Sequence, residues 1–450
     1  MSITLTNALL FDLDPVSVVE GSLRIDGETI DSIGPSVTPQ AGDEVIDCHG
    51  AVVMAGLVNG HTHLYSVPAL GMPGPPRTPR NFHEILELIW WRLDRAHDAE
   101  SVEVSGTIGA LDALRCGTTT MIDHHASPSH IAGSLDDLER GIDAVGLRGV
   151  LCYESTDRHG TKDGLAGLEE NRRYIESCRT RADGRFAALV GAHAAFTMSD
   201  ELLAGCVRLA AETNTGVHIH VAEDPCDDEI CRREYGSPLV DRLARCGIGD
   251  PKNPATAKTI LAHCTHLSKD DAIRLSGAVG AIAHNPRSNM NNQVGYAPIG
   301  AIIGSGAAGG GPGAIQLGTD GIGSDMFAEI RHAWFKSRDG KAGISPADVV
   351  AMLVRSARTA GGLLGRKLGS LSAGAAADVV VTDYIPAAPL TSENAAGHLI
   401  FAMDSQHVRD VLIGGKWALR NREVVFVDER PARRRAVEVA RRLWSRMPTS

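Results

Sequence analysis

The stretch Val217–Glu223, with the sequence VHIHVAE, decides the fold. It has the pattern of a buried strand that ends with His218, His220 and Glu223 close together. Two imidazoles and a carboxylate at the end of an apolar strand are costly to desolvate without a binding partner, and a metal ion is the simplest one. We predict that this strand end forms one hydrolytic metal centre with three others: Asn59–His63 (NGHTH), Leu261–Cys264 (LAHC) and Leu317–Gly321 (LGTDG).

The bulk composition is that of an ordinary globular chain. The 450 residues are 43% hydrophobic, and 44 Lys and Arg face 55 Asp and Glu, for a net charge of -11. This acidic balance argues against nucleic acid and against an anionic membrane as partners. The first residues lack the pattern of a signal peptide, and no apolar run reaches membrane-spanning length. The 9 cysteines form no CxxC pair, so we expect reduced thiols in a cytoplasmic protein.

Short apolar runs alternate with helical patterns between about Leu57 and Ala360. Eight strands alternating with helices predict a parallel (β/α)8 barrel, also called a TIM barrel, whose active site lies at the carboxyl ends of the strands. Every run ends in a residue that can titrate or bind metal: His61, Asp123, Glu154, His193, His220, His263, His284 and Asp320.

The two chain ends read as strands and turns. We predict that residues 1–55 and 366–430 form one small composite β-sandwich and that residues 56–365 form the barrel. Residues 431–450 are expected to form a C-terminal, solvated surface helix because their charge is strongly basic. The Gly- and Ala-rich stretch Gly304–Gly313 is predicted to be a flexible connection.

Four residues are assigned as metal ligands. His61 and His63 flank Thr62, and residues two apart on a strand face the same side, so both rings can reach one ion. Together with His220 and Asp320 they form a set of three imidazoles and one carboxylate. This set suits zinc, which we favour, or ferrous iron, with one position left for water. The fourth strand, Ala187–Ala194, has no Lys that would bridge two ions as a carbamate, so we predict one divalent metal per chain.

The neighbours of these ligands are assigned to catalysis. Glu223 lies three residues beyond His220 and is predicted to move protons beside the metal. His263 and Asp320 are expected to take a proton from the attacking water. His218 is expected to support the ligands from behind. For His193 and His284, a place in the pocket wall and a supporting place behind it remain open alternatives.

The pattern resembles the amidohydrolase superfamily, in the branch that includes S-adenosylhomocysteine deaminase, guanine deaminase and the triazine hydrolases. The stretches that carry the resemblance are Gly60–His63, Gly191–Ala194, His218–Glu223, Ala262–Cys264, Ala283–Pro286 with Ser288-Asn289, and Gly318–Gly321. The resemblance spans nearly the whole chain. It implies the same ligands and catalytic residues, and by analogy a homodimer.

Finer stretches resemble the SsnA-type putative aminohydrolases. These are Trp90–Ala96, Asp123–Pro128, Arg287–Asn292 and Gly318–Phe327. Two positions depart from most of the branch, which has Ala at Arg287 and SNN at Ser324–Met326. The known substrates of the branch therefore do not transfer to this chain by resemblance alone.

Six residues are predicted to bind substrate: Trp90, Trp91, His125, His193, Arg287 and Asp325. The two tryptophans, with His124 and His125, would supply a flat wall for a heteroaromatic ring. Arg287 would pair with an anionic substituent or a ring carbonyl. The alternatives are core packing for the tryptophans and an ion pair between Arg287 and Asp325.

The predicted reaction is hydrolysis of an exocyclic amino group on a nitrogen heterocycle such as a purine, pterin or triazine, with release of ammonia. A second hypothesis keeps the centre but changes the bond to a cyclic amide, a formimino group or a carbon–chlorine bond. A third, a barrel that has lost catalysis, is disfavoured because all four ligands and Glu223 are present.

Overall fold

The centre of the fold is a closed ring of parallel strands. The computed structural model describes residues 2–250, 252–306 and 314–448. Hydrogen bonding gives two parallel sheets, β6-β7-β8-β9 and β10-β11-β12-β13-β14. Parallel bridges from Thr62 to Asp320 and from Ser155 to Ala192 join these sheets at both edges. The strands are β6 (Leu57–Thr62), β7 (Thr118–His125), β8 (Arg148–Tyr153), β9 (Phe186–Ala188), β10 (Val190–Ala194), β11 (Val217–Val221), β12 (Ile260–His263), β13 (Ala281–His284) and β14 (Ile315–Leu317). Only Leu189 separates β9 from β10, which share the fourth position, so the predicted (β/α)8 barrel is confirmed.

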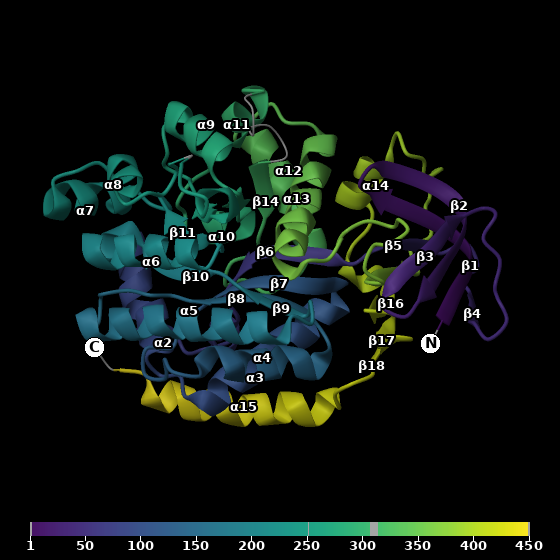
Figure 1. Ribbon diagram of the computed structural model, residues 1–450, viewed down its shortest axis with the longest axis horizontal. Helices are drawn as coiled ribbons and strands as arrows, with labels where there is room; N and C mark the ends of the chain where they lie inside the picture. Colours follow the sequence, from purple (N-terminus) through teal and green to yellow (C-terminus); the bar gives the residue numbers. More distant parts are fainter. Residues whose placement is uncertain (1, 251, 307–313, 449–450) are drawn as a thin grey trace.

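Helices connect the strands and cover the outside of the barrel (Figure 1). They are α3 (Ala99–Arg115), α4 (Ser134–Val145), α5 (Thr161–Arg181), α6 (Asp200–Glu212), α7 (Cys226–Tyr235), α8 (Leu239–Arg245), α9 (Lys269–Ala278), α10 (Pro286–Asn291), α11 (Ile299–Gly304), α12 (Met326–Asp339) and α13 (Pro346–Leu364). Ser199, Ser268 and Ser345 cap α6, α9 and α13 by accepting a hydrogen bond from a backbone N–H of the first turn.

Short helices between β6 and α3 stand over the carboxyl ends of the strands. They are η1 (Leu64–Ala69), α1 (Phe82–Ile85), η2 (Leu86–Trp90) and α2 (Trp91–Asp94). Asn81 caps α1 by accepting a hydrogen bond from the Glu84 N–H. These helices bring the Trp90-Trp91 pair to the open end of the barrel.

Strands from both ends of the chain pair with one another beside the barrel (Figure 1). They are β1 (Ser2–Leu13), β2 (Val16–Asp26), β3 (Thr29–Gly34), β4 (Glu44–Asp47), β5 (Val52–Ala55), β15 (Val379–Thr382), β16 (Val408–Ile413), β17 (Lys416–Arg420) and β18 (Glu423–Val424). Antiparallel pairing of β5 with β15 joins the two ends, and β4 pairs with β1. We predicted a small sandwich, and hydrogen bonds connect all nine strands into one sheet with its own core, which includes Leu5, Leu23, Val379 and Leu412.

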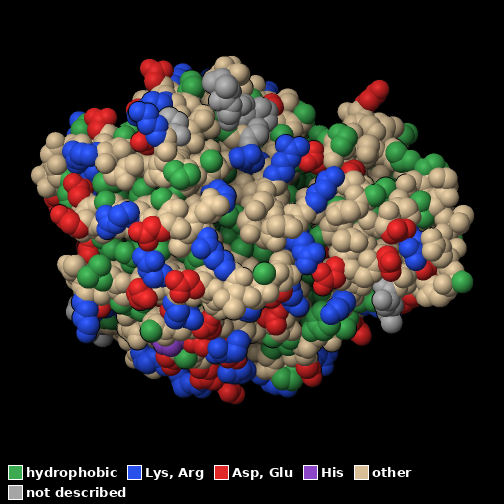
Figure 2. Space-filling model, viewed as in Figure 1, with side chains coloured by type: hydrophobic (Ala, Val, Ile, Leu, Met, Phe, Trp, Pro, Cys, Tyr) green, Lys and Arg blue, Asp and Glu red, His purple; other side chains and the backbone are tan. Residues whose placement is uncertain are grey.

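The C-terminal helix α15 (Glu429–Arg446) lies on the surface with most of its residues exposed or half-buried, and one face packs against the barrel. Leu443 is fully buried, and the Trp444 indole N–H donates to the Pro68 carbonyl at 2.9 Å. Arg433 pairs with Asp112 of α3 at 2.6 Å. The interspersed Lys, Arg, Asp and Glu side chains along the α15 edge in Figure 2 reflect such pairing. Arg435 and Arg442 form further exposed ion pairs with Glu103 and Glu100 of α3, so part of the basic charge of the helix is balanced at the surface.

Two further expectations concern the rest of the chain. Among the described residues, no helix is both long and apolar enough to cross a membrane. The Gly- and Ala-rich stretch Gly304–Gly313 begins at the last residue of α11, and positions 307–313 lie outside the described residues.

Candidate metal centre and active site

The backbone at three strand ends takes an unusual conformation. Ala222, His263 and Asp320 have φ of 48°, 70° and 56°, the left-handed region that non-glycine residues rarely adopt. Such residues each cost on the order of 1–3 kcal/mol and cluster at functional sites. Ala222 separates His220 from Glu223, and both of these side chains reach the same pocket. The turn at Ala222 therefore allows one strand to supply two functional groups.

The four predicted ligands meet at one point. The ligand atoms of His61, His63, His220 and Asp320 all lie within 4.8 Å of one another. Nε2 of His63 is 3.1 Å from Nε2 of His220 and 3.0 Å from Oδ1 of Asp320. Nε2 of His61 is fully buried, makes no hydrogen bond within the described chain and lies 3.7 Å from the same Asp320 oxygen. An orphaned imidazole nitrogen beside a carboxylate fits a metal ion at this point.

Hydrogen bonds on the far side of each ring prepare these nitrogens for a metal. Nδ1 of His63 donates to the His124 carbonyl at 2.6 Å, and Nδ1 of His220 donates to the His193 carbonyl at 2.8 Å. Nδ1 of His61 lies 2.8 Å from Nε2 of His218. A proton fixed on Nδ1 leaves a lone pair on Nε2, the usual arrangement in metal-binding histidines. The predicted supporting place of His218 agrees with this geometry.

Asp320 is also fixed in place. The Ser288 hydroxyl donates to its Oδ2 at 2.5 Å. Gly318, just before it, passes so close to His61 that an added Cβ would lie 2.6 Å from the His61 Cβ. Burial acts to raise the pKa of Asp320, but the neighbouring His61 and His63 rings outweigh it and hold that pKa well below its usual value. Asp320 is therefore a carboxylate, the form that binds metal.

The pKa of Glu223 is shifted in the opposite direction to that of Asp320. Burial and the charge of Asp320 raise its pKa well above the usual value. Its Oε1 accepts a hydrogen bond from the Asn292 amide at 3.3 Å. Its Oε2 lies 3.4 Å from Nε2 of His263, which is 3.7 Å from Oδ2 of Asp320. Two carboxyl groups whose pKa values are pushed apart in one site are suited to different roles, one anionic and one able to carry a proton.

His263 is oriented as a base. Its Nδ1 lies 2.8 Å from Oδ1 of Asn289, an amide oxygen that can only accept, so this nitrogen carries the proton. Burial lowers the pKa of His263. The neutral ring therefore presents the lone pair of Nε2 to the space between Glu223 and Asp320.

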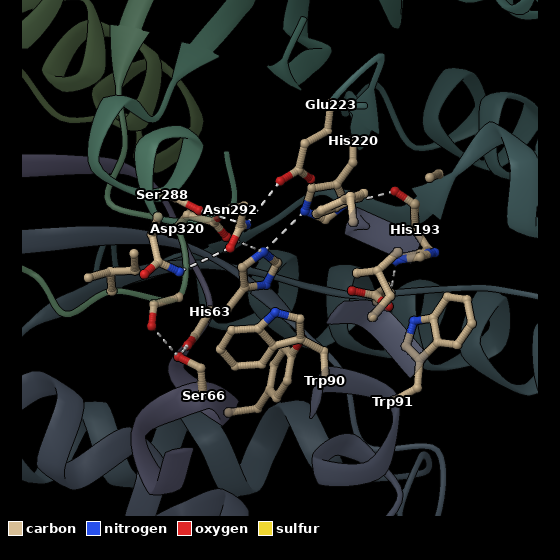
Figure 3. Close-up of a pocket in the computed structure, with 18 of the residues that line it drawn as sticks. His63, Ser66, Trp90, Trp91, His193, His220, Glu223, Ser288, Asn292 and Asp320 are labelled. Carbon is tan, nitrogen blue, oxygen red and sulfur yellow. Dashed lines mark hydrogen bonds and ion pairs between the residues drawn. The ribbon is translucent and has the colours of Figure 1, made fainter. Parts of the chain in front are cut away.

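A pocket opens onto this cluster (Figure 3). One side of the pocket holds His63, His220, Glu223 and Asp320. Its remaining wall is largely apolar and includes Tyr65, Phe82, Leu86, Trp90, Trp91 and Phe196. Aromatic side chains in this wall suit a flat heterocyclic ligand.

Three of the six predicted substrate-binding residues border this pocket: Trp90, Trp91 and His193. The others lie elsewhere, which corrects the sequence-based assignment. His125 is fully buried behind the wall with Nε2 2.9 Å from the Ser127 hydroxyl. Arg287 forms an ion pair with buried Glu329. Asp325 caps α12 and accepts a hydrogen bond from Ser405 at 2.7 Å.

The two open alternatives for histidines separate in the structure. His193 borders the pocket, and burial lowers its pKa to about 3, so the ring is neutral. His284 is buried away from the pocket lining and packs against Tyr296, with ring centroids 5.4 Å apart.

Sequence reasoning gave no site role to several pocket residues. Glu154 was noted only as a strand end, and Ser288 and Asn292 only as parts of motifs. Asp227 was given no role; it lies in the first turn of α7, four residues after Glu223, and its Oδ2 accepts a hydrogen bond from the Glu223 backbone N–H at 3.2 Å. Burial and the charge of Glu223 raise the pKa of Asp227 to about 8. The spacing of four residues was the one signal that pointed to it.

Fold and site together define a barrel hydrolase that uses a metal cofactor. The sequence matches the amidohydrolase family over residues 52–418. It is 31% identical over 447 residues, and 95% of each chain, to a 5-methylthioadenosine/S-adenosylhomocysteine deaminase of Pelotomaculum thermopropionicum. It is 28% identical over 453 residues, and 99% of each chain, to a 5'-deoxyadenosine deaminase of Methanosarcina mazei. The chain therefore belongs to the amidohydrolase family, and the predicted resemblance is confirmed.

Solved structures share the fold. An adenosine deaminase from Xanthomonas campestris with bound zinc superposes with a TM-score of 0.81 at 22% identity, covering 100% of this chain and 99% of the other. An atrazine chlorohydrolase from Arthrobacter aurescens in complex with zinc gives 0.79 at 20% identity, covering 97% and 100%. The family, the relatives and the assembled site make this chain a metal-dependent aminohydrolase that acts on a nitrogen heterocycle.

Proposed function

We propose that this aminohydrolase removes the exocyclic amino group of an adenine compound, either the base or a nucleoside, and releases ammonia. The observation that carries the proposal is the pair of carboxyl groups beside the histidine cluster, with the pKa of Glu223 raised and that of Asp320 lowered. The names of the relatives support adenine as the ring. One zinc ion per chain is the proposed cofactor, held by His61, His63, His220 and Asp320.

The residues of this chain divide the proton transfers. A divalent metal bound here would activate water as the nucleophile. His263 Nε2 and Asp320 lie where they can accept the proton of that water. Glu223, whose carboxyl group keeps a proton above its usual pH range, donates to the ring nitrogen next to the amino-bearing carbon. That carbon thereby becomes electrophilic. His263, whose Nε2 lies 3.4 Å from Oε2 of Glu223, passes the proton taken from the water to Glu223, which donates it to the departing amine. The proton left on the added hydroxyl group returns to Glu223 as the carbonyl forms, so both residues regain their starting states.

The proposal predicts which compounds release ammonia. Metal-loaded protein is incubated separately with adenine, adenosine, 5'-deoxyadenosine and 5'-methylthioadenosine. The comparison compounds are a pterin and a triazine that each carry an exocyclic amino group. Ammonia is expected from at least one adenine compound, at a rate above those for the other two rings. Ammonia from the pterin or triazine alone would show that the ring is wrong. No ammonia from any compound would favour the cyclic-amide, formimino or carbon–chlorine hypothesis.

Removal of the metal is a second expected result. Dialysis against a chelator should abolish ammonia release, and added zinc should restore it. Because a ligand stabilises only the folded state, by about 4 kcal/mol at 1,000 times its Kd, the metal-free protein should also melt at a lower temperature. Metal content, activity and Tm are measured on the same samples. Full activity in protein whose metal content has fallen to background would refute the metal-dependent mechanism.

A further inference from the structure

Glu154 occupies the pocket wall with a fixed negative charge. It follows β8 directly, is 3% exposed and borders the pocket beside His193. Nη1 of Arg158 donates to its Oε1 at 2.7 Å, and Nη2 of the same side chain bonds Asp94. One guanidinium is thus shared between two buried carboxylates. It holds the Glu154 side chain in one position without neutralising both charges.

The nearest ring nitrogen to Oε1 is an acceptor as well. Nδ1 of His193 lies 2.6 Å from the Thr197 hydroxyl, which donates its single proton to the Ala194 carbonyl at 3.0 Å. With the hydroxyl proton of Thr197 directed to that carbonyl, Nδ1 of His193 carries the ring proton and Nε2 presents a lone pair. That Nε2 is 3.7 Å from Oε1 of Glu154. Two acceptors consequently face the pocket side by side.

The other oxygen of Glu154 is similarly short of donors. Nε2 of His124 lies 3.1 Å and 3.0 Å from the carbonyls of Ala192 and His218, so that nitrogen carries the ring proton. Nδ1 of His124 is 3.4 Å from Oε2 and can donate only if the ring takes up a second proton. Among the described residues, Arg158 is the one permanently protonated group that donates a hydrogen bond to Glu154. A carboxylate can accept about four hydrogen bonds, and a buried acceptor without a donor lowers the stability of the folded protein.

We propose that Glu154, with His193, is a specificity-determining acceptor subsite for a second donor group of the substrate. The chemistry that fits two acceptors 3.7 Å apart is a paired donor, either an amino group on the ring or a vicinal diol on a substituent. In Figure 3, His193 lies across His220 from Ser288 and Asp320. One nitrogen or oxygen of each of Glu154, His193 and His220 lies within 4.8 Å of the others, so the second donor would bind beside the histidine cluster. The inference rests on the proposed function, because it places another part of the same substrate.

Two substrate pairs test the subsite. Adenosine and 2',3'-dideoxyadenosine differ in the diol, and 2,6-diaminopurine and adenine differ in an amino group. Wild-type protein should prefer the donor-bearing member of one pair by about 10- to 100-fold in kcat/KM, as expected for a hydrogen bond to a charged group. Glu154→Gln should lower that preference, because an amide has one acceptor oxygen and no charge, and it should lower kcat/KM more for the donor-bearing member than for the other member of the pair. The pair that responds identifies the donor.

A matched control distinguishes recognition from folding. Glu170 is another buried glutamate, paired with Arg173 in α5 and outside the pocket lining. Glu170→Gln should keep the wild-type preference. Equal loss on every compound in Glu154→Gln, or no preference in either pair for wild type, would overturn the proposal. A finding of two metal ions per chain, one of which is lost in Glu154→Gln, would also overturn it, because Glu154 and His193 would then bind a metal ion.

Binding measurements keep this result separate from the reaction. Glu223→Gln protein, with and without Glu154→Gln, is titrated with both pairs and with 2,4-diamino-1,3,5-triazine against 2-amino-1,3,5-triazine. If no adenine compound releases ammonia, the proposed substrate class is wrong. The subsite is still supported if one donor-bearing compound binds more tightly than its partner compound and Glu154→Gln reduces that difference. Equal affinity, or no binding, across all three pairs overturns the subsite even if ammonia is released.

Discussion

His220→Ala is expected to bind no stoichiometric metal and to lose more than about 10³-fold in kcat/KM. Loss of a supporting residue behind a metal ligand already costs about 10- to 100-fold in affinity or activity, and a ligand itself costs more. Nε2 of His220 lies 3.1 Å from Nε2 of His63, so its removal opens one corner of the four-residue set. The set loses one imidazole donor, and the three that remain bind the ion more weakly.

Metal per chain and ammonia release are the two measurements for this variant. His398→Ala is a suitable control, because that histidine lies in α14 (Ala395–Phe401) with Nδ1 2.7 Å from the Tyr384 hydroxyl, away from the pocket lining. It should keep both the metal and the activity. A full metal complement in His220→Ala would remove His220 from the ligand set.

Glu223→Gln should retain the metal and lose about 10²- to 10⁴-fold in turnover, the usual contribution of a positioned acid–base group. Glutamine preserves the shape of the side chain and the contact with Asn292 at 3.3 Å, but it cannot exchange a proton. Because Glu223 lies beside the ligand set without belonging to it, metal binding should be unaffected. The separation of metal content from turnover distinguishes this residue from His220.

The control for this result is Glu229→Gln, which changes an exposed acid in the first turn of α7. It should behave as wild type in ammonia release. Turnover in Glu223→Gln within a few-fold of wild type would show that another group carries the proton. The candidate would then be Asp227, whose carboxyl group borders the same pocket and has a pKa raised to about 8.

Much of the architecture could be predicted because metal chemistry constrains residue types strongly. Histidines and acids at the ends of apolar runs are expensive unless a shared site uses them, and a parallel barrel is the fold that brings eight strand ends together. The pair His61 and His63 could be placed on one face because side chains two apart on a strand point the same way. The same logic gave Glu223 a place beside the ligands.

Side-chain direction at single positions could not be predicted in this way. His124 and His125 are adjacent on β7, so they point to opposite faces, and the sequence does not say which faces the barrel interior. In the structure, the His124 ring lies 4.8 Å from those of His218 and His220, and His125 turns away toward Ser127. The predicted contact of His125 with substrate was therefore wrong.

The sequence by itself determined the barrel, the convergence of three histidines and one aspartate, and the acid beside them, because these depend on local alternation and on residue types that few environments tolerate. Only the tertiary structure decided which charged side chains pair with residues far away in the sequence and which face the pocket. Arg287 forms an ion pair with Glu329 and does not line the pocket. Glu154 accepts a hydrogen bond from Arg158, has other acceptor atoms around it and does line the pocket. The energy of a buried charge depends on the groups within a few ångströms of it, and in this fold those groups come from separate strands and helices.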